Sequence, residues 1–170
     1  MKSKLIALIA LIALILLIGC EKTELPNELS GTKWQRVERN SSSGWQKEYD
    51  DKGNFTTIPF ISTNILSIEL IFIDNYSGII HVKEVQKTDW QDGSNETNED
   101  IFFDITSDFQ YSYDSQSRKG KISCVLDFRG SAYESLIKDG YININEDFGL
   151  FFDSDDLWLK DKDEVFTKLE

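Results

Sequence analysis

The chain is poor in the side chains that most enzymes use for nucleophilic, acid–base and zinc chemistry. Its 170 residues include one histidine, His81, and two cysteines, Cys20 and Cys124. A base that titrates near neutrality is usually histidine, and zinc sites are built mainly from histidine and cysteine. The sequence also has no Gly-x-Ser-x-Gly elbow, no His-Glu-x-x-His pair and no phosphate-cradling glycine loop. We therefore predict a non-enzymatic protein without catalytic residues, metal or cofactor.

Positive charge is also scarce. Lysine and arginine total 18 against 30 aspartates and glutamates, which gives a net charge of −12 at pH 7. Nucleic-acid affinity comes largely from lysine and arginine that neutralise phosphates, so this composition argues strongly against a nucleic-acid partner. The same charge disfavours electrostatic docking on anionic lipid and favours solubility.

No apolar run is long enough to form a membrane-spanning helix. The longest, from Leu5 to Ile18, has 14 residues, whereas a bilayer core requires about 20. Lys2 and Lys4 precede this run and a glycine follows it, which is the pattern of a secretory signal peptide over residues 1–19. Its removal would change the net charge from −12 to −14, because both lysines are lost. An uncleaved anchor and an ordinary secretory signal with a chance cysteine are the alternatives.

The residues at the end of this run, Leu17-Ile18-Gly19-Cys20, resemble the lipobox that the bacterial lipoprotein signal peptidase recognises. The resemblance implies that Leu17, Ile18 and Gly19 are the recognition residues and that the chain is cut before Cys20. The Cys20 sulfur would then carry a diacylglycerol, and its amino group a further acyl chain, so that the membrane becomes a partner through lipid. Two or more acyl chains hold a protein firmly on a bilayer.

Cys124 would then be the remaining thiol, and no internal disulfide could form. It alternates with polar residues, together with Ile122, Leu126 and Phe128, as in a strand that is apolar on one face. We expect a buried, unreactive thiol rather than a nucleophile. His81 alternates with Ile80 and Val82 in the same way, so its ring should lie on the exposed face of a strand or at its rim.

The rest of the sequence predicts one all-β domain of residues 31–170, preceded by a short tether of residues 20–30. Segments of alternating polarity recur between turn-forming residues, as in a barrel or sandwich. The strongest hairpin joins 64–73 to 79–85 through the turn at 74–78. We expect an exposed loop over 92–100, which has no apolar residue, and one short helix after a capping box of Ser131 and Glu134. Strands are expected in these segments: 32–39, 45–49, 55–60, 64–73, 79–85, 101–105, 108–114, 121–128, 141–145, 150–152, 157–160 and 164–169.

Two motifs at the ends of this domain resemble those of the small lipocalin-like lipoproteins of Bacteroidetes-type bacteria. They are Gly31-Thr32-Lys33-Trp34 at its start and Val165-Phe166-Thr167-Lys168 at its end. The resemblance implies an antiparallel up-and-down meander of about eight strands, closed into a barrel. It also implies a lipid-anchored protein of the Gram-negative cell envelope, on the outer membrane, that binds a small apolar ligand. In such barrels a basic residue packs over the tryptophan, and Lys168 or Arg36 could do so here.

Trp34 also has a structural reading from its own sequence context. Gly31 permits a tight backbone entry, and the large apolar ring of Trp34 could then cover one end of the barrel as a structural plug.

A cluster of carboxylates is the remaining candidate for chemistry: Asp147, Asp153, Asp155 and Asp156. Hard oxygen ligands of this kind suit calcium, although their spacing fits no EF-hand loop and a solvated acidic turn is the common alternative. A carboxylate-based hydrolase, the one enzymatic exception considered, would need two acidic side chains roughly 5–10 Å apart in a cleft.

Two functional hypotheses from different classes remain. In the first, the many aromatic residues line a hollow barrel that binds a small apolar ligand. In the second, the rings fill the core, and the protein is an interaction, inhibitor or accessory module with an acidic surface. An eight-stranded barrel is just wide enough for either arrangement, so the interior volume distinguishes the two hypotheses.

Overall fold

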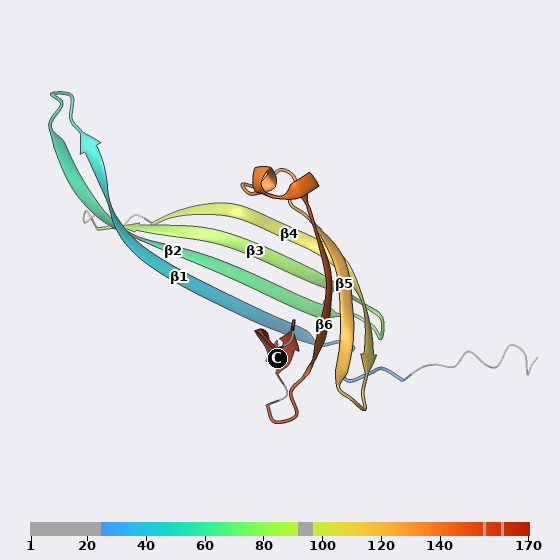
Figure 1. The fold of residues 1–170 in the computed structure, drawn as a ribbon. Coiled ribbons are helices and arrows are strands. Elements are labelled where there is room, and N and C mark those ends of the chain that lie inside the picture. Colours follow the sequence, from blue (N-terminus) through green and yellow to red (C-terminus); the bar gives the residue numbers. More distant parts are fainter. Residues whose placement is uncertain (1–24, 92–96, 155, 161) are drawn as a thin grey trace, which may run out of the picture.

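The chain folds into a closed barrel of eight antiparallel strands that follow one another in sequence order (Figure 1). The computed structural model describes residues 25–91, 97–154, 156–160 and 162–170. The predicted all-β, up-and-down barrel is confirmed. Its strands are β1 Lys33–Tyr49, β2 Phe55–Phe72, β3 Ser77–Trp90, β4 Thr97–Asp114, β5 Lys119–Asp127, β6 Tyr141–Leu150, β7 Leu157–Leu159 and β8 Glu164–Leu169.

The first four strands are longer than the alternation of apolar residues predicts. The two segments expected at 32–39 and 45–49 form one strand, because the polar stretch between them pairs without a break with residues 60–64 of β2. Residues 97–100, expected in a loop, belong to β4. An ion pair between Lys87 and Glu99 (3.0 Å) and a hydrogen bond from Thr97 to Asp89 (2.6 Å) connect this polar end to β3. The rest of the expected loop, 92–96, lies outside the described residues.

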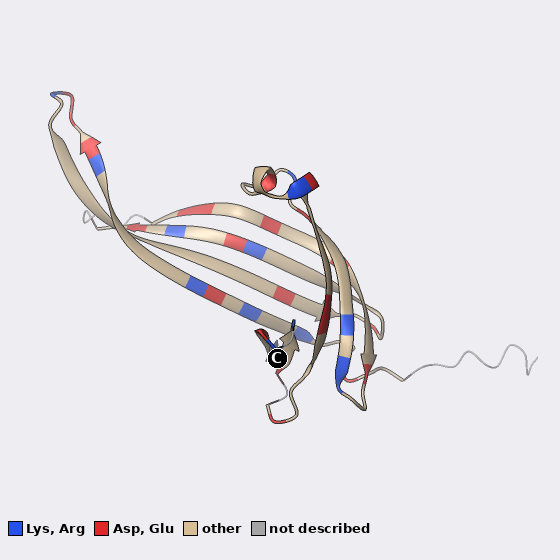
Figure 2. Cartoon of the chain, viewed as in Figure 1, with Lys and Arg blue, Asp and Glu red and all other residues tan. Residues whose placement is uncertain are grey.

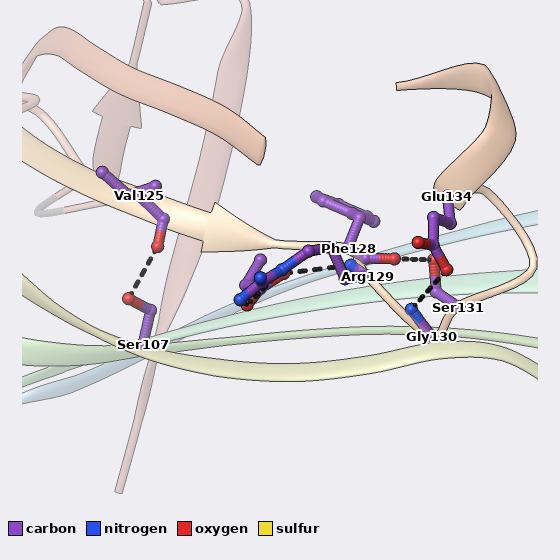
Figure 3. A network of polar contacts seen from close by, with 8 residues as sticks. Ser107, Val125, Phe128, Arg129, Gly130, Ser131 and Glu134 are labelled. Carbon is purple, nitrogen blue, oxygen red and sulfur yellow. Dashed lines mark hydrogen bonds and ion pairs between the residues drawn. The ribbon is translucent and has the colours of Figure 1, made fainter. Parts of the chain in front are cut away.

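The predicted helix is replaced by two single 3-10 turns, Glu134–Leu136 and Lys138–Gly140. The capping residues are present, but they hold a turn (Figure 3). Gly130 N–H donates to the Glu134 carboxylate (2.8 Å), and the Ser131 hydroxyl donates to the Phe128 carbonyl (2.6 Å). Asp139 adopts a positive φ of 60°, which no α-helix can contain, so the helical turn cannot continue.

One end of the barrel is filled by aromatic rings. Phe72 lies at the centre, with ring centroids 5.2 Å from Phe109, 4.8 Å from Tyr111 and 5.9 Å from Phe148. Two glycines make room for them: a Cβ on Gly78 would lie 2.2 Å from the Phe109 ring, and one on Gly120 would lie 2.7 Å from the Phe148 ring. The rings of this end therefore pack directly against the strand backbone at both glycines.

The segment before β1 completes this filled end. Leu29 is fully buried, and the N–H groups of Leu29 and Ser30 donate to the Asn27 side-chain oxygen (2.9 and 3.0 Å). The Asn27 amide in turn donates to the Tyr111 hydroxyl (3.2 Å). Part of the predicted tether, residues 27–30, thus packs on the barrel, while its residues 20–24 lie outside the described residues.

The other end of the barrel is open. β8 pairs with β1 through only three residues, from Lys33 to Gln35, and β6 pairs with β7 through only three, from Phe148 to Leu150. β1 and β2 instead continue as a two-stranded arm beyond the last β2–β3 pair, Phe60 with Trp90 (Figure 1). Beyond the closed end, four long strands therefore face β5 and β6 across a space that no further strand of the described chain encloses.

Removing a ring from the filled end tests how much of the stability resides there. We expect Phe72→Ala to lower the free energy of unfolding by about 3–5 kcal/mol, because the cavity it leaves is surrounded by rings that cannot collapse inward. The matched control is Phe152→Ala, at a side chain that is 72% exposed. It should cost less than about 1 kcal/mol, with both values measured by urea unfolding. Equal losses would contradict the assignment of the core.

Candidate ligand-binding cavity

A cavity of about 320 Å³ lies inside the barrel, next to the end that the aromatic rings fill. Its walls come from opposite sides of the barrel, so the cavity is part of the lumen. Most of the lining side chains are aliphatic, and the polar ones lie at one side. The lining residues are Ile68, Leu70, Ile80, Val82, Ile122, Leu126, Ile142, Asn143, Ile144, Glu146, Leu159, Lys160, Glu164 and Phe166.

Strand alternation places these aliphatic side chains in the lumen. Ile68 and Leu70 alternate with the outward Glu69, and Ile80 and Val82 alternate with the outward His81. Ile142 and Ile144 do the same on β6, in the segment Tyr-Ile-Asn-Ile-Asn. The alternation in the sequence placed Ile80 and Val82 opposite the exposed face of their strand but assigned none of these residues to a ligand site. Their signal was the repeat of isoleucine at every second position, which also occurs in ordinary filled cores.

The cavity opens toward the side of the barrel, between β6 and the β8–β1 wall. Within the described chain, no strand pairs with 141–147 on the side away from β5, and none pairs with β1 beyond Gln35 on its β8 side. Ile142 is 40% exposed there, which leaves an aliphatic surface at the opening. Such an opening can admit a ligand without unfolding of the filled end.

The rim of this opening carries charges of both signs. Glu146, Lys160 and Glu164 line it, and the Arg36 guanidinium lies 3.1 Å from the Glu164 carboxylate. Arg36 also pairs with Glu38 on its own strand. An apolar molecule could therefore bury its body in the lumen while a polar end group remains at this rim.

A larger hollow, about 430 Å³, lies on the other side of the barrel where β4 and β5 diverge, and it is more polar and more open. The Ser107 hydroxyl donates across this divergence to the Val125 carbonyl (2.9 Å; Figure 3). Arg129 makes hydrogen bonds of 3.0 and 2.7 Å to Asp127 and holds the pKa of that carboxyl down to about 2. The charged groups at this hollow satisfy one another, so we favour the aliphatic cavity as the ligand site.

Trp34 lies in the core with 2% of its surface exposed. Its ring N–H donates to the Thr32 hydroxyl (2.8 Å), so its one polar group is satisfied. Of the two basic residues considered for this ring, Lys168 packs over it, with its ammonium 5.8 Å from the ring centroid. Arg36 instead joins the ion pairs at the cavity rim.

Cys124 and His81 lie where the alternation predicts. Cys124 faces the core with 9% of its surface exposed, and burial raises the pKa of its thiol. The His81 ring lies on the outer face, 2.6 Å from the Asp104 carboxylate, which also pairs with Lys83 (3.1 Å). These contacts hold the pKa of Asp104 below its usual value.

Three residues of the acidic cluster, Asp147, Asp153 and Asp156, lie in the part of the chain that the structure covers. Asp147 lies on β6 opposite Lys121, and Asp153 is exposed in the turn before β7. Residues 25–91, 97–154, 156–160 and 162–170 contain no group of three or more side chains placed to hold a metal ion. Asp155 lies outside the described residues, as do the signal-peptide residues Leu17, Ile18 and Gly19 and the lipidation residue Cys20.

Acidic and basic residues are interspersed along the strands (Figure 2). Within the described residues, no helix is long and apolar enough to span a membrane.

No family model, curated protein sequence or solved structure matches this chain. Its function therefore has to be argued from its own residues.

The thiol of Cys124 provides a test of the burial of the inward face of β5. In a Cys20→Ser variant, Cys124 is the remaining cysteine, and we expect Ellman's reagent to modify it at least about tenfold more slowly in the native protein than in urea. Burial limits access, and the raised pKa lowers the thiolate fraction at pH 8. Rapid modification of the native protein would show that β5 opens to solvent.

Proposed function

We propose that this protein is a non-enzymatic, lipid-anchored cell-envelope protein that binds a small apolar molecule in the lumen of its barrel. The observation that carries the proposal is the cavity of about 320 Å³ with aliphatic walls. Ligand pockets in proteins usually occupy about 300–1,000 Å³ and are lined mainly by apolar side chains with a few polar groups. The cavity is at the small end of this range, so the ligand would be small.

The charge distribution and the rim favour an apolar body with a polar end group. A ligand that enters between β6 and β8 would exchange water for the side chains of Ile68, Val82 and Ile144. Its polar end would meet Lys160, Glu146 and Glu164 at the opening. An interaction module with a filled core is the competing hypothesis, and the cavity is the reason that we rank it second.

Membrane attachment rests on the sequence alone. The apolar run and the lipobox-like Leu17-Ile18-Gly19-Cys20 support a lipid on Cys20. The chain enters the barrel at its filled end, where Leu29 is buried and Lys33 pairs with Leu169. A tether at this point would leave the cavity opening free of the anchor.

Filling the cavity should abolish binding of an apolar probe. We expect the fluorescent probe N-phenyl-1-naphthylamine to bind the native protein, and Ile144→Trp to weaken binding at least tenfold, because the larger ring occupies the lumen. The measurement is a fluorescence titration at matched protein concentrations.

Val125→Trp is the matched control, since Val125 lies on the outer face of neighbouring β5 and is 49% exposed. This variant should bind the probe as the native protein does. Absence of probe binding to the native protein, or equal weakening by both variants, would contradict a ligand-binding lumen.

Lipid attachment is tested separately. We expect the chain expressed in a Gram-negative host to incorporate labelled palmitate, and Cys20→Ser to eliminate the label and release the protein from the membrane fraction. Fractionation and labelling of Cys124→Ser give the control, which should remain labelled. Palmitate incorporation that survives Cys20→Ser would exclude Cys20 as the anchor.

A further inference from the structure

The concave face of the long sheet changes character beyond the cavity. Residues on β2 with the parity of Leu70 and Phe72 face the barrel interior. After Ile68 and Leu66, the next inward positions on this strand are Asn64 and Ser62. Their partners across the sheet are also polar, and together they form a polar band of two rows: Asn40, Asn64, Gln86 and Asp100 in the first, Ser42, Ser62, Thr88 and Asn98 in the second.

Two groups in the middle of this polar band are buried without a partner. Ser62 has 7% of its surface exposed, and neither its hydroxyl nor the side-chain oxygen of Asn64 has a hydrogen-bond partner among the described residues. A buried polar atom without a hydrogen bond costs about 1–3 kcal/mol relative to one that is satisfied. Ser62 and Asn64 lie two residues apart on β2, so the folded protein bears this free-energy cost twice. A purely structural role does not explain why both polar side chains are present.

An aromatic pair borders the polar band on its far side. Phe60 and Trp90 lie opposite each other on β2 and β3, with ring centroids 5.4 Å apart. Gly44 lies under the Phe60 ring, where a Cβ would come within 2.5 Å of it. Successive rows are about 7 Å apart along the strands, so rings, hydroxyls and amides lie within one small area.

The chemistry of the polar band points to an uncharged ligand with many hydroxyls. The amide and hydroxyl side chains of Asn64, Gln86, Ser62 and Thr88 can both donate and accept hydrogen bonds, as sugar hydroxyls do. An aromatic ring offers apolar area for the C–H face of a sugar. The inward charged residues of these rows and the adjacent one are Asp100, Glu38 and Glu84, all negative, which disfavours an anionic ligand.

We propose that the polar band, with Phe60 and Trp90, is a second binding site for a neutral saccharide, separate from the apolar cavity. In this site the saccharide supplies the hydrogen bonds that Ser62 and Asn64 lack and packs on the aromatic pair. The row of Leu66 and Glu84 separates it from the cavity-lining Ile68 and Val82. The site does not depend on an apolar ligand in the lumen, so it can be tested whether or not the lumen binds one.

The test is isothermal titration calorimetry with three defined trisaccharides on the native protein. We expect maltotriose or tri-N-acetylchitotriose to bind at millimolar concentration or below, and trigalacturonate, which is anionic, to bind at least several-fold more weakly. Lack of binding by both neutral sugars at 10 mM would overturn the proposal. Equal affinity for the anionic sugar would overturn it as well.

Ser62→Ala then separates ligand recognition from structure. We expect this variant to lose affinity for the neutral sugar by about 3- to 10-fold, the usual net worth of one hydrogen bond. Its melting temperature should be unchanged or higher, because an unsatisfied hydroxyl has been removed.

The matched control is Ser67→Ala on the outer face of the same strand, where the Gln35 amide contacts the serine hydroxyl at 3.4 Å. Ser67→Ala should leave sugar affinity unchanged. Unaltered affinity in Ser62→Ala, or an equal loss in both variants, would overturn the assignment of the polar band as the sugar site.

Discussion

The structure depends on how the barrel closes. Only a short belt of pairs joins β6, β7, β8 and β1, so closure is complete at one end, where Phe72 and its neighbouring rings fill the lumen. This packing requires glycine at positions 78 and 120, because a side chain at either one would displace the rings of Phe109 and Phe148. A core in interlocking contact offers no room for a ligand. The rings therefore fill the closed end, whereas the aliphatic part of the same buried core lines the cavity.

The two proposed sites follow from this unequal closure. Along β2, inward side chains pass from Phe72 through Leu70 and Ile68 to Asn64, Ser62 and Phe60, which is a change from ring to aliphatic to polar to ring on one strand. An evenly closed barrel would bury the polar positions at a large desolvation cost. Here β5 and β6 have turned away from the long sheet (Figure 1), and the polar positions on β1 and β4 are exposed, so that the buried polar atoms are confined to Ser62 and Asn64 on β2 among the described residues of the band. The same geometry thus leaves an apolar cavity near the filled end of the barrel and a polar surface farther from that end.

The fold was predictable from sequence because alternation is a local signal, whereas the unequal closure is not local. Ile122, Cys124 and Leu126 repeat at every second position, and the structure places all three inside, as predicted. The predicted strands were too short where the alternation of apolar residues stops. Asn40–Gly44 and Thr97–Asp100 carry no apolar repeat, yet they pair with β2 and β3 and belong to the sheet. The sequence placed Leu29 in a polar tether. Its burial follows from the position of this segment at the filled end of the barrel, which the sequence does not indicate. Ile122 and Ile144 both line the cavity, and both repeat at every second position as residues of a filled core do, so the repeat alone could not identify a cavity.

The described ion pairs and the unsatisfied polar groups lie on different faces of the sheet. Some charged groups on the described strands pair with opposite charges across strands, such as Lys33 with Glu69 and Lys87 with Glu99 on the outer face. Pairs of this kind, exposed to solvent, stabilise little and are screened by salt. The unsatisfied groups lie on the inner face instead, at Ser62 and Asn64. An exposed ion pair changes the free energy of folding little, whereas a buried polar atom without a hydrogen bond costs about 1–3 kcal/mol. Polar side chains retained at such a cost on the inner face are therefore better evidence for ligand binding than the ion pairs outside.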